Sequence, residues 1–210
     1  MKIAVIGTGS VGGTLGKGWA AKGHKVIFGS RRPGDPDIKK LLEKAGAGAR
    51  ALPPANAAAE SEVVALATPW DATQRAIAGL GDLSAKIVLD VTNPILPGLA
   101  GLELGTTDSG GEAVARWAAG ALVVKIFNTT GYGNMADPVY AGERATMFYC
   151  GDDGRAKAAA KQLAEDLGFE PADVGPLSQA RYLEALAMLW ISMAAKYGYG
   201  RDIAFRLMRR

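Results

Sequence analysis

Residues 1–32, MKIAVIGTGSVGGTLGKGWAAKGHKVIFGSRR, decide the fold of this chain. The apolar run at residues 1–6 predicts a strand, which breaks at the glycine-rich segment Gly7–Gly12. The segment that follows has the apolar spacing of a helix, and Gly23 ends it. A second apolar run at residues 25–28 predicts a second strand, so the order is strand, turn, helix, strand.

Three glycines in this turn have the spacing of a dinucleotide-binding site. Gly7 permits the tight turn, Gly9 lets the backbone approach a diphosphate, and Gly12 allows the helix and the strand to pack closely. The free amide groups at the helix start then face the phosphates. The predicted cofactor-binding residues of the turn are Gly7, Thr8, Gly9, Ser10, Val11 and Gly12. The alternative is a glycine-rich turn in an α/β domain that binds no nucleotide.

The end of the second predicted strand indicates which dinucleotide binds. An NAD site usually has an acidic residue there for the ribose 2′-hydroxyl, whereas an NADP site supplies arginine for the 2′-phosphate. Ser30, Arg31 and Arg32 follow this strand, and no carboxylate occurs before Asp35. Because a guanidinium group can bind phosphate through two parallel hydrogen bonds, the sequence favours NADP(H) over NAD(H). The alternative is that both arginines are only solvated loop residues.

The composition is that of an ordinary globular protein. The 210 residues are 49% hydrophobic and 21% charged, enough for one substantial core and at most a small extra lobe. The net charge of +3 is small and scattered, so we expect no nucleic-acid partner. The most apolar window, residues 185–195, is about half the length that a membrane span requires, so we expect no membrane partner.

Cysteine and histidine occur once each. Cys150 excludes internal disulfides, and its place at the end of an apolar run favours burial over a nucleophilic role. His24 precedes the second strand, and we interpret it as structural. No metal site is expected, because no Cys/His cluster has the spacing of metal ligands. The N-terminus leads directly into the first strand without room for a signal peptide, so we expect a cytoplasmic protein.

Apolar runs and helical patterns alternate along the chain. Val63–Ala67 and Ile87–Val91 are continuous apolar runs, typical of strands buried on both faces. Further strands are predicted at 50–52, 122–127, 146–150 and 169–174, and helices at 38–42, over the alanines up to Glu60, behind Ser109–Glu112 and at 155–167. The pattern predicts an α/β fold: a Rossmann-type, doubly wound, mostly parallel sheet with helices on both faces and a small C-terminal helical portion.

Two loops are predicted to line the cofactor crevice, because ligands bind at the carboxyl ends of the strands in such a sheet. Thr68, Pro69 and Trp70 begin a helix, with Thr68 as N-cap and Pro69 at the first helical position. The alternative for Trp70 is that it only covers an edge of the core. Asn93 and Pro94 follow the next strand. We predict that all five residues bind the cofactor.

The last predicted element is a helix over residues 178–197. Its apolar residues fall on one main stripe and also off it, as Leu189 does. A helix that is apolar over so much of its circumference must be buried on more than one side. We therefore predict a homodimer, with residues 1–176 as an NADP-binding domain and residues 177–210 as a C-terminal helical extension that makes the dimer contact.

Five motifs carry a family resemblance: Gly7–Gly12, Gly29–Arg32, Thr68–Trp70, Cys150–Asp153 and Val174–Ser178. Together they resemble the NADP-dependent reductases of the deazaflavin coenzyme factor 420, over nearly the whole chain. The resemblance implies a Rossmann domain with a small C-terminal portion, and direct hydride exchange between nicotinamide C4 and deazaflavin C5.

One segment, Val124–Thr130, departs from the archaeal deazaflavin enzymes, which tend to carry histidine near Asn128. It is similar instead to bacterial relatives and to the cytosolic reductase domain of the STEAP metalloreductases, in which hydride passes from NADPH to a flavin. The resemblance thus implies a small-molecule redox acceptor, either factor 420 or a flavin (FMN or FAD).

Hydride transfer between two such rings requires little acid–base chemistry from the protein. Asn128, Thr129 and Thr130 follow a central strand, and we predict that they hydrogen-bond the acceptor ring or the nicotinamide amide. A carbonyl dehydrogenase would need an acid near its substrate. Tyr132 and Lys125 are the only local candidates, and we interpret Lys125 as a packing or charge-pairing residue.

Three functions follow from these observations. The first is an NADPH-dependent oxidoreductase with a deazaflavin or flavin acceptor. The second is an NADP-dependent dehydrogenase or imine reductase of a small molecule, against which the short C-terminal portion argues. The third is a non-catalytic NADP(H) sensor, which is compatible with the missing acid and base residues.

Overall fold

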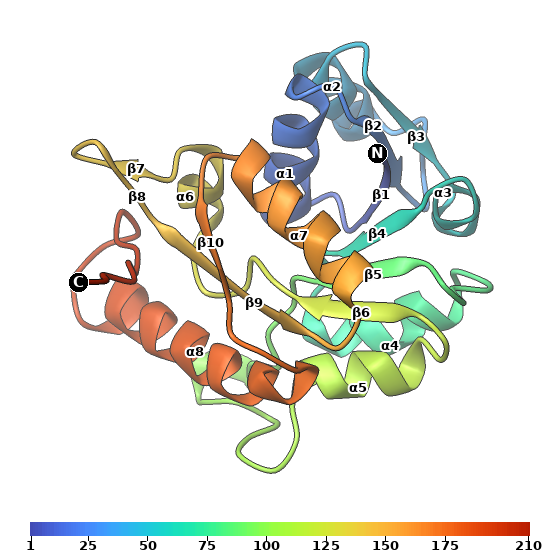
Figure 1. Cartoon of the computed structure of the whole chain (residues 1–210). Coiled ribbons are helices and arrows are strands. Elements are labelled where there is room, and N and C mark those ends of the chain that lie inside the picture. Colours follow the sequence, from blue (N-terminus) through green and yellow to red (C-terminus); the bar gives the residue numbers. More distant parts are fainter.

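One mixed sheet forms the centre of the molecule (Figure 1). The computed structural model describes residues 1–210, and the sheet has the strand order β10-β9-β6-β5-β4-β1-β2-β3. Neighbouring strands are parallel except at β6 and β9. The chain order reverses between β1 and β4, which confirms the predicted doubly wound, mostly parallel architecture. The strands are β1 Lys2–Ile6, β2 Lys25–Gly29, β3 Ala49–Leu52, β4 Val63–Leu66, β5 Ile87–Asp90, β6 Leu122–Lys125, β9 Thr146–Gly151 and β10 Glu170–Asp173.

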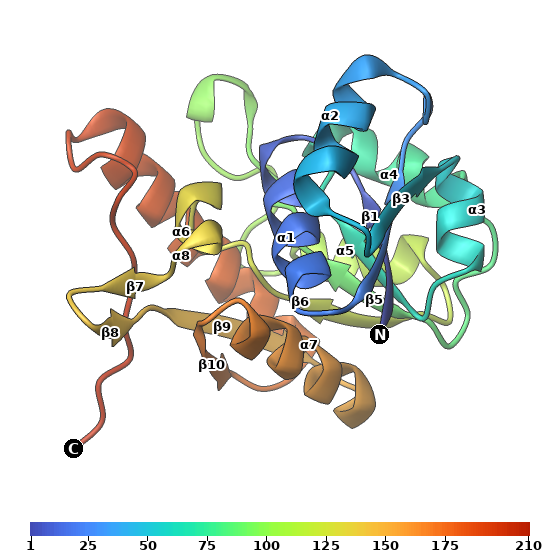
Figure 2. The same ribbon diagram turned by 90° about the horizontal axis from the view of Figure 1, so that it is seen from above.

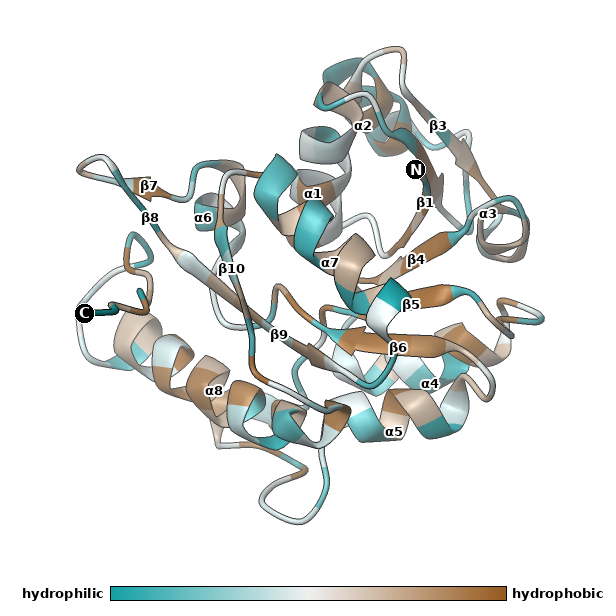
Figure 3. Cartoon of the chain, viewed as in Figure 1, coloured by the Kyte–Doolittle hydropathy of each residue, from teal (hydrophilic) through white to brown (hydrophobic).

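Each face of the sheet carries its own hydrophobic core. Val63 and Ala65 of β4 belong to one core, while Val64 and Leu66 belong to the other. The first core lies under α1, α2, α6 and α7, and the second lies under α3, α4, α5 and α8. The central strands β4, β5 and β6 are accordingly the most apolar part of Figure 3. The helices are α1 Ser10–Ala21, α2 Pro36–Ala45, α3 Pro54–Ala59, α4 Trp70–Ala78, α5 Gly110–Trp117, α6 Tyr132–Ala136, α7 Gly154–Asp166 and α8 Ala180–Lys196.

Of two predicted helix N-caps, the one of α5 is confirmed and the one of α4 is wrong. Ser109 caps α5 as predicted, since its Oγ accepts a hydrogen bond from the Glu112 amide at 3.1 Å. The prediction that Thr68 caps α4 is wrong, because Pro69 occupies the N-cap position with an extended ψ of 145°. The Thr68 hydroxyl instead lies 2.8 Å from the Thr73 hydroxyl.

Three short elements between β6 and β9 have no counterpart in the predicted pattern. They are α6 and a hairpin of two antiparallel strands, β7 Val139–Tyr140 and β8 Glu143–Arg144. The C-terminal tail runs beside this hairpin (Figure 2), where Arg206 forms an ion pair with Glu143 and the Thr146 amide donates to the Phe205 carbonyl at 2.9 Å.

The C-terminal helix is confirmed, although it begins later than predicted. A short 3₁₀ turn, Leu177–Gln179, precedes α8, and Leu183 of α8 belongs to the core of the second face. On the outer side, Tyr182 is 65% exposed and Leu189 is 52% exposed. The division of the chain at residue 176 and the homodimer stay predictions. None of the helices is both long and apolar enough to cross a membrane.

Candidate functional site

The glycine turn, Gly7–Gly12, joins β1 to α1 at the carboxyl edge of the sheet. Gly7 has a φ of +104°, and a Cβ there would lie 2.4 Å from the Ala67 carbonyl oxygen. At Gly12 a Cβ would lie 1.9 Å from the Gly7 carbonyl oxygen. These two positions therefore accept only glycine, which confirms the tight turn and the close packing of helix on strand.

The middle glycine of the turn has a different environment. A Cβ at Gly9 would meet no atom within 4 Å, so the protein itself does not require glycine there. Gly9 is the N-cap of α1, no side chain caps this helix, and its first turn contains no acidic residue. The first amides of α1 thus have no side-chain acceptor, and the space beside Gly9 fits the close approach of a diphosphate.

A cavity of about 390 Å³ adjoins the glycine turn. Thr8, Gly9 and Ser10 line it, together with Tyr132 at the start of α6. Its charged lining residues are Lys17, Lys40 and Lys44 and one carboxylate, Asp37, so the lining carries a net positive charge. The cavity therefore combines backbone donors with positive charge, which suits a phosphorylated ligand.

Arg31 and Arg32 follow β2 beside the glycine turn, on the same edge of the sheet. Both are exposed, and neither guanidinium group forms an ion pair or a hydrogen bond within the protein. The loop is held by the Ser30 hydroxyl, which accepts a hydrogen bond from the Arg32 amide at 3.1 Å. The next carboxylate along the chain, Asp35, caps α2 by accepting a hydrogen bond from the Asp37 amide at 3.0 Å. The guanidinium groups are thus available for a 2′-phosphate, and Asp35 is engaged elsewhere.

The loop after β4 places Trp70 against the core of the second face. Its ring lies 5.2 Å from the ring of Trp117, and its indole N–H donates to the Glu103 carboxylate at 2.9 Å. This packing corresponds to the alternative role considered for Trp70. Contact of Thr68, Pro69 or Trp70 with a nucleotide stays a prediction.

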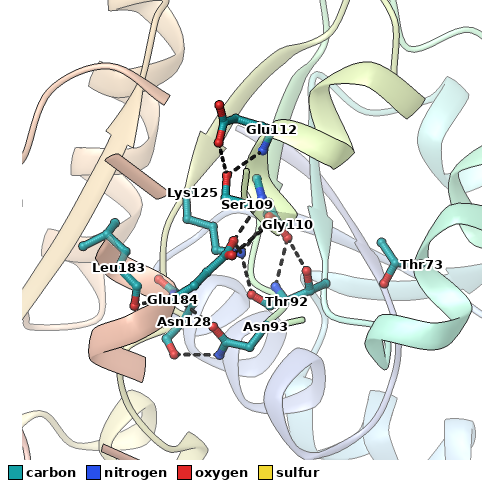
Figure 4. Close-up of polar contacts among 12 residues, drawn as sticks. Thr73, Thr92, Asn93, Ser109, Gly110, Glu112, Lys125, Asn128, Leu183 and Glu184 are labelled. Atoms are coloured by element: carbon teal, nitrogen blue, oxygen red, sulfur yellow. Dashed lines mark hydrogen bonds and ion pairs between the residues drawn. The ribbon is translucent and has the colours of Figure 1, made fainter. Parts of the chain in front are cut away.

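The structure brings Asn93 and Asn128 together at the ends of β5 and β6, and we call them the asparagine pair (Figure 4). The Asn93 side-chain amide donates to the Asn128 carbonyl at 2.9 Å, and the Asn128 side-chain amide donates to Asn93 Oδ1 at 3.0 Å. Asn128 Nδ2 also donates to the Leu183 carbonyl at 3.1 Å. Because this carbonyl can only accept, the orientation of the Asn128 amide group is fixed.

One atom of the asparagine pair has no partner. Asn128 is 4% exposed, and its Oδ1 accepts no hydrogen bond from any group of the protein. An unsatisfied buried acceptor is costly, so this atom requires a donor from outside the protein, either a ligand or a water molecule. Of the neighbouring predicted residues, Thr129 is buried, and the Thr130 hydroxyl accepts from the Asn134 amide at 2.8 Å. Pro94 lies close to Gly110 of α5.

A buried ion cluster is formed by Asp90, Lys125 and Glu184. Figure 4 shows Lys125 and Glu184 of this cluster near the asparagine pair. Lys125 Nζ lies 2.8 Å from Asp90 Oδ2 and 2.8 Å from Glu184 Oε1, and it donates to the Thr92 carbonyl at 2.6 Å. Burial works to lower the pKa of Lys125, but the two carboxylates outweigh it, so the pKa is raised. Lys125 is thus a charge-pairing residue, as interpreted, and it has no proton to offer a substrate.

Sequence reasoning missed both acidic members of the ion cluster. Asp90 ends the apolar run of β5, and Glu184 follows Leu183 on the buried side of α8. An acidic residue within an apolar strand or on a buried helix face is rarely left without a partner. That pattern was the available signal, although it does not identify the partner.

The remaining titratable candidates lie outside the site or are inert. His24 bridges the N-terminal amine, at 3.0 Å, and Asp166, at 2.7 Å, which supports its structural interpretation. Cys150 is fully buried, and burial raises the pKa of its thiol to about 12. No group of three or more His, Cys, Asp or Glu side chains is arranged to hold a metal ion.

Comparison with known proteins agrees with this geometry. The model of the family described as NADP oxidoreductase, coenzyme F420-dependent, matches residues 2–94. The crystal structure of a proposed F420-dependent NADP reductase from Arthrobacter sp. FB24 has a TM-score of 0.89 and 33% identity, covering 100% of both chains. A reductive aminase from Aspergillus terreus in complex with NADPH and ethyl levulinate has a TM-score of 0.69 and 18% identity, over 94% of this chain and 62% of that one, which shows the fold alone.

A curated relative is longer than this chain. The metalloreductase STEAP3 of Rattus norvegicus is 28% identical over 188 residues, which are 89% of this chain but 36% of that protein. Because the Arthrobacter protein exceeds 30% identity over its entire length, the family is established. The chain belongs to the family of coenzyme F420-dependent NADP oxidoreductases, and it is an NADP-dependent oxidoreductase.

Proposed function

We propose that this protein transfers hydride between NADP(H) and a deazaflavin or flavin acceptor, with factor 420 as the leading acceptor. In the reducing direction NADPH gives up two electrons and one hydrogen as hydride, and the acceptor gains them together with one proton from water. The name of the matching family and that of the Arthrobacter relative support factor 420. The STEAP3 relative, a metalloreductase, keeps a flavin as the other candidate.

Along the carboxyl edge of the sheet, successive groups of residues match the diphosphate, the 2′-phosphate and the nicotinamide of NADP(H). The amides of the glycine turn would hold the diphosphate, and Ser30, Arg31 and Arg32 would hold the 2′-phosphate. In a doubly wound sheet the nicotinamide lies beyond the switch point, on the side of β4, β5 and β6. The unpaired Asn128 Oδ1 is at that end, where it would accept an N–H from the nicotinamide carboxamide or the acceptor ring.

One observation carries the choice of acceptor class. The edge beyond the switch point presents amides and hydroxyls, and the only amine there, Lys125, donates to Asp90, Glu184 and Thr92 and is fully buried. Reduction of a carbonyl requires an acid in contact with the substrate, whereas hydride exchange between two redox rings requires mainly alignment and exclusion of water. The absence of an available acid among these residues therefore favours a deazaflavin or flavin ring as the acceptor.

Tyr132 supports the second candidate, reduction of a small carbonyl or imine. Its side chain lines the cavity beside Thr8–Ser10 and is 43% exposed, so its hydroxyl is accessible to a substrate. If Tyr132 were the general acid, Tyr132→Phe would lower the rate by about 100-fold or more. Under the proposed function the same substitution leaves the rate with factor 420 or a flavin nearly unchanged.

The test is to follow NADPH oxidation with factor 420, FMN, FAD, a cyclic imine and a set of carbonyl compounds, using the unmutated protein and Tyr132→Phe. We expect turnover with factor 420 or a flavin, and similar rates for both proteins. Turnover of only a carbonyl or imine, lost in Tyr132→Phe, would favour the second candidate. Tight NADPH binding without any turnover would favour a sensor.

A further inference from the structure

We propose that Glu184 is a positioning residue that, through Lys125 and Asp90 of the ion cluster, sets the asparagine pair at the nicotinamide end of the site. The inference rests on the proposed function, because it gives the asparagine pair its role. It extends that function to α8, the helix that contributes Glu184.

The ion cluster is fully desolvated. Asp90 and Lys125 are 0% exposed and Glu184 is 1% exposed, so none of the charges is in contact with bulk solvent. Two carboxylates face one ammonium group, and the excess negative charge is met by the N-terminus of α5. Glu184 accepts hydrogen bonds from the amides of Gly110, at 2.9 Å, and Gly111, at 3.0 Å. Both the charges and the free amides of a helix start are thus satisfied.

Such a cluster contributes geometry more than stability. Replacing buried ion pairs by apolar side chains of similar volume is often neutral or stabilising, because desolvation of the charges is costly. Removing a single partner has the opposite effect, since it leaves the remaining charges buried and unbalanced. The cluster in this protein is therefore best explained by the contacts that it imposes on its neighbours.

Those contacts lead directly to the asparagine pair. Lys125 Nζ holds the Thr92 carbonyl at 2.6 Å, one residue before Asn93. Leu183, one residue before Glu184, offers its carbonyl to Asn128 Nδ2 at 3.1 Å. The cluster thus fixes the backbone next to Asn93 and the acceptor that orients the Asn128 amide (Figure 4). Any shift of Glu184 moves the Leu183 carbonyl and releases Asn128 Oδ1 from its position.

Close packing leaves little room for water to take the place of the carboxylate. A Cβ at Gly110 would lie 3.0 Å from Glu184 Oε1 and 3.2 Å from the Trp70 ring. At Gly111 it would lie 2.9 Å from the Ala180 Cβ at the start of α8. We therefore expect loss of the Glu184 charge to move α8 against α5.

The test compares Glu184→Gln with Glu112→Gln as a matched control. Glu112 also links α5 to α8, through Arg181 at 2.6 Å, but it lies outside the ion cluster. Three quantities are measured: the NADPH dissociation constant, the fluorescence of the bound nicotinamide, and kcat with factor 420 or a flavin. For Glu184→Gln we expect unchanged NADPH affinity, weaker nicotinamide fluorescence and a loss of kcat of about 10- to 100-fold, the scale of a misplaced reacting group. The control should change none of the three.

A double-mutant cycle with Asn128→Ala shows whether Glu184 acts through the asparagine pair. In the Asn128→Ala background, Glu184→Gln should cause little further loss of kcat or fluorescence. Fully additive losses, or equal losses in the Glu112→Gln control, would overturn the proposal. If thermal unfolding shows that Glu184→Gln does not fold, Glu184→Asp, which keeps the charge, takes its place with a smaller expected loss.

The fluorescence measurement separates this proposal from the proposed function. If the unmutated protein reduces no deazaflavin or flavin, the proposed function fails, while the nicotinamide fluorescence still reports on Glu184. If the unmutated protein is active and Glu184→Gln alters neither kcat nor fluorescence, the positioning role fails and the proposed function stands.

Discussion

At the scale of single residues, the preference for NADP(H) depends on two arginines without a partner in the protein. Arg31 and Arg32 lie beside the glycine turn, and the next carboxylate along the chain, Asp35, caps a helix. This arrangement leaves a positive charge where the extra phosphate of NADP(H) would lie. The same charge has nothing to bind in NAD(H).

Arg31→Ala should therefore weaken NADPH binding by about 1–3 kcal/mol, the scale of a lost charge-assisted hydrogen bond. NADH affinity should be unaffected, and so should NADPH affinity in a control variant, Arg75→Ala, on the exposed surface of α4. Calorimetric titration of both nucleotides measures the effect. Equal affinity of the unmutated protein for NADPH and NADH would remove the premise.

Asn128 carries the second residue-scale prediction. Its Oδ1 has no hydrogen-bond partner in the protein, and it lies at the end of the site that we propose for the nicotinamide. Asn128→Ala should lower acceptor turnover by about 10- to 100-fold, because the reacting ring loses its alignment, with a smaller effect on NADPH affinity. An unchanged rate with every acceptor, measured under saturating NADPH, would reject this role.

Cys150 should be inert in the folded protein. Burial raises the pKa of its thiol from 9.0 to about 12, so the folded state holds the proton more tightly than the unfolded state. This contribution to stability is complete below pH 9 and is lost as the pH rises toward 12. Alkylation with iodoacetamide at pH 8 should be slow in the native protein and fast in denaturant. Similar rates in both conditions would show that the thiol is accessible.

At the scale of elements, one glycine of the glycine turn is required by the fold, and another is free for nucleotide binding. Gly12 has no room for a side chain, whereas Gly9 faces open space at a φ of −73° that any residue adopts. The two positions therefore make different predictions for the same substitution to alanine.

Gly12→Ala should lower the free energy of unfolding by about 1–3 kcal/mol or more, because its Cβ would overlap the Gly7 carbonyl. Gly9→Ala should leave the free energy of unfolding nearly unchanged and weaken NADPH binding. Urea unfolding and nucleotide titration measure the two effects. If Gly9→Ala bound NADPH as well as the unmutated protein, the diphosphate would not approach this turn.

The elements also show how far the sequence predicts the structure. The turn and the central strands depend on local spacing and continuous burial, so their positions follow from the chain alone. The α6 helix and the β7–β8 hairpin are short and largely exposed, and they leave no such pattern. The Thr68 cap failed because Pro69 itself takes the N-cap position.

The ion cluster and the asparagine pair were beyond prediction for another reason. Lys125 lies 35 residues from Asp90 in the sequence, and Leu183 lies 55 residues from Asn128. The first contact depends on the pairing of β5 with β6, and the second depends on how α8 docks on the sheet. No local pattern encodes either. The sequence indicated which loops meet at the carboxyl edge, but not the buried contacts that orient them.

At the scale of the whole molecule, the outer side of α8 stays apolar and exposed. Tyr182 and Leu189 lie on that side. Tyr197, the C-cap residue of α8, is 71% exposed. Soluble monomers rarely expose a long apolar stripe, so a second copy of the chain is the cover that we predict. The predicted dimer would place the two α8 helices against each other.

Light scattering coupled to size-exclusion chromatography should thus show a dimer of the unmutated protein, and Leu189→Glu should shift it to monomer because a carboxylate cannot be buried unpaired in the contact. Gln74→Glu, on the exposed side of α4, is the control for the added charge. A monomer at micromolar concentration for the unmutated protein would contradict the dimer without affecting the nucleotide site.

Direct hydride transfer from bound NADPH to a ring acceptor is the central claim, and rapid mixing with NADPH deuterated at both C4 positions tests it most directly. We predict that reduction of factor 420 or a flavin is slower with the deuterated nucleotide, and that reduced factor 420 carries the label. No reduction of either acceptor, or reduction at equal rates with unlabelled product, would contradict the account.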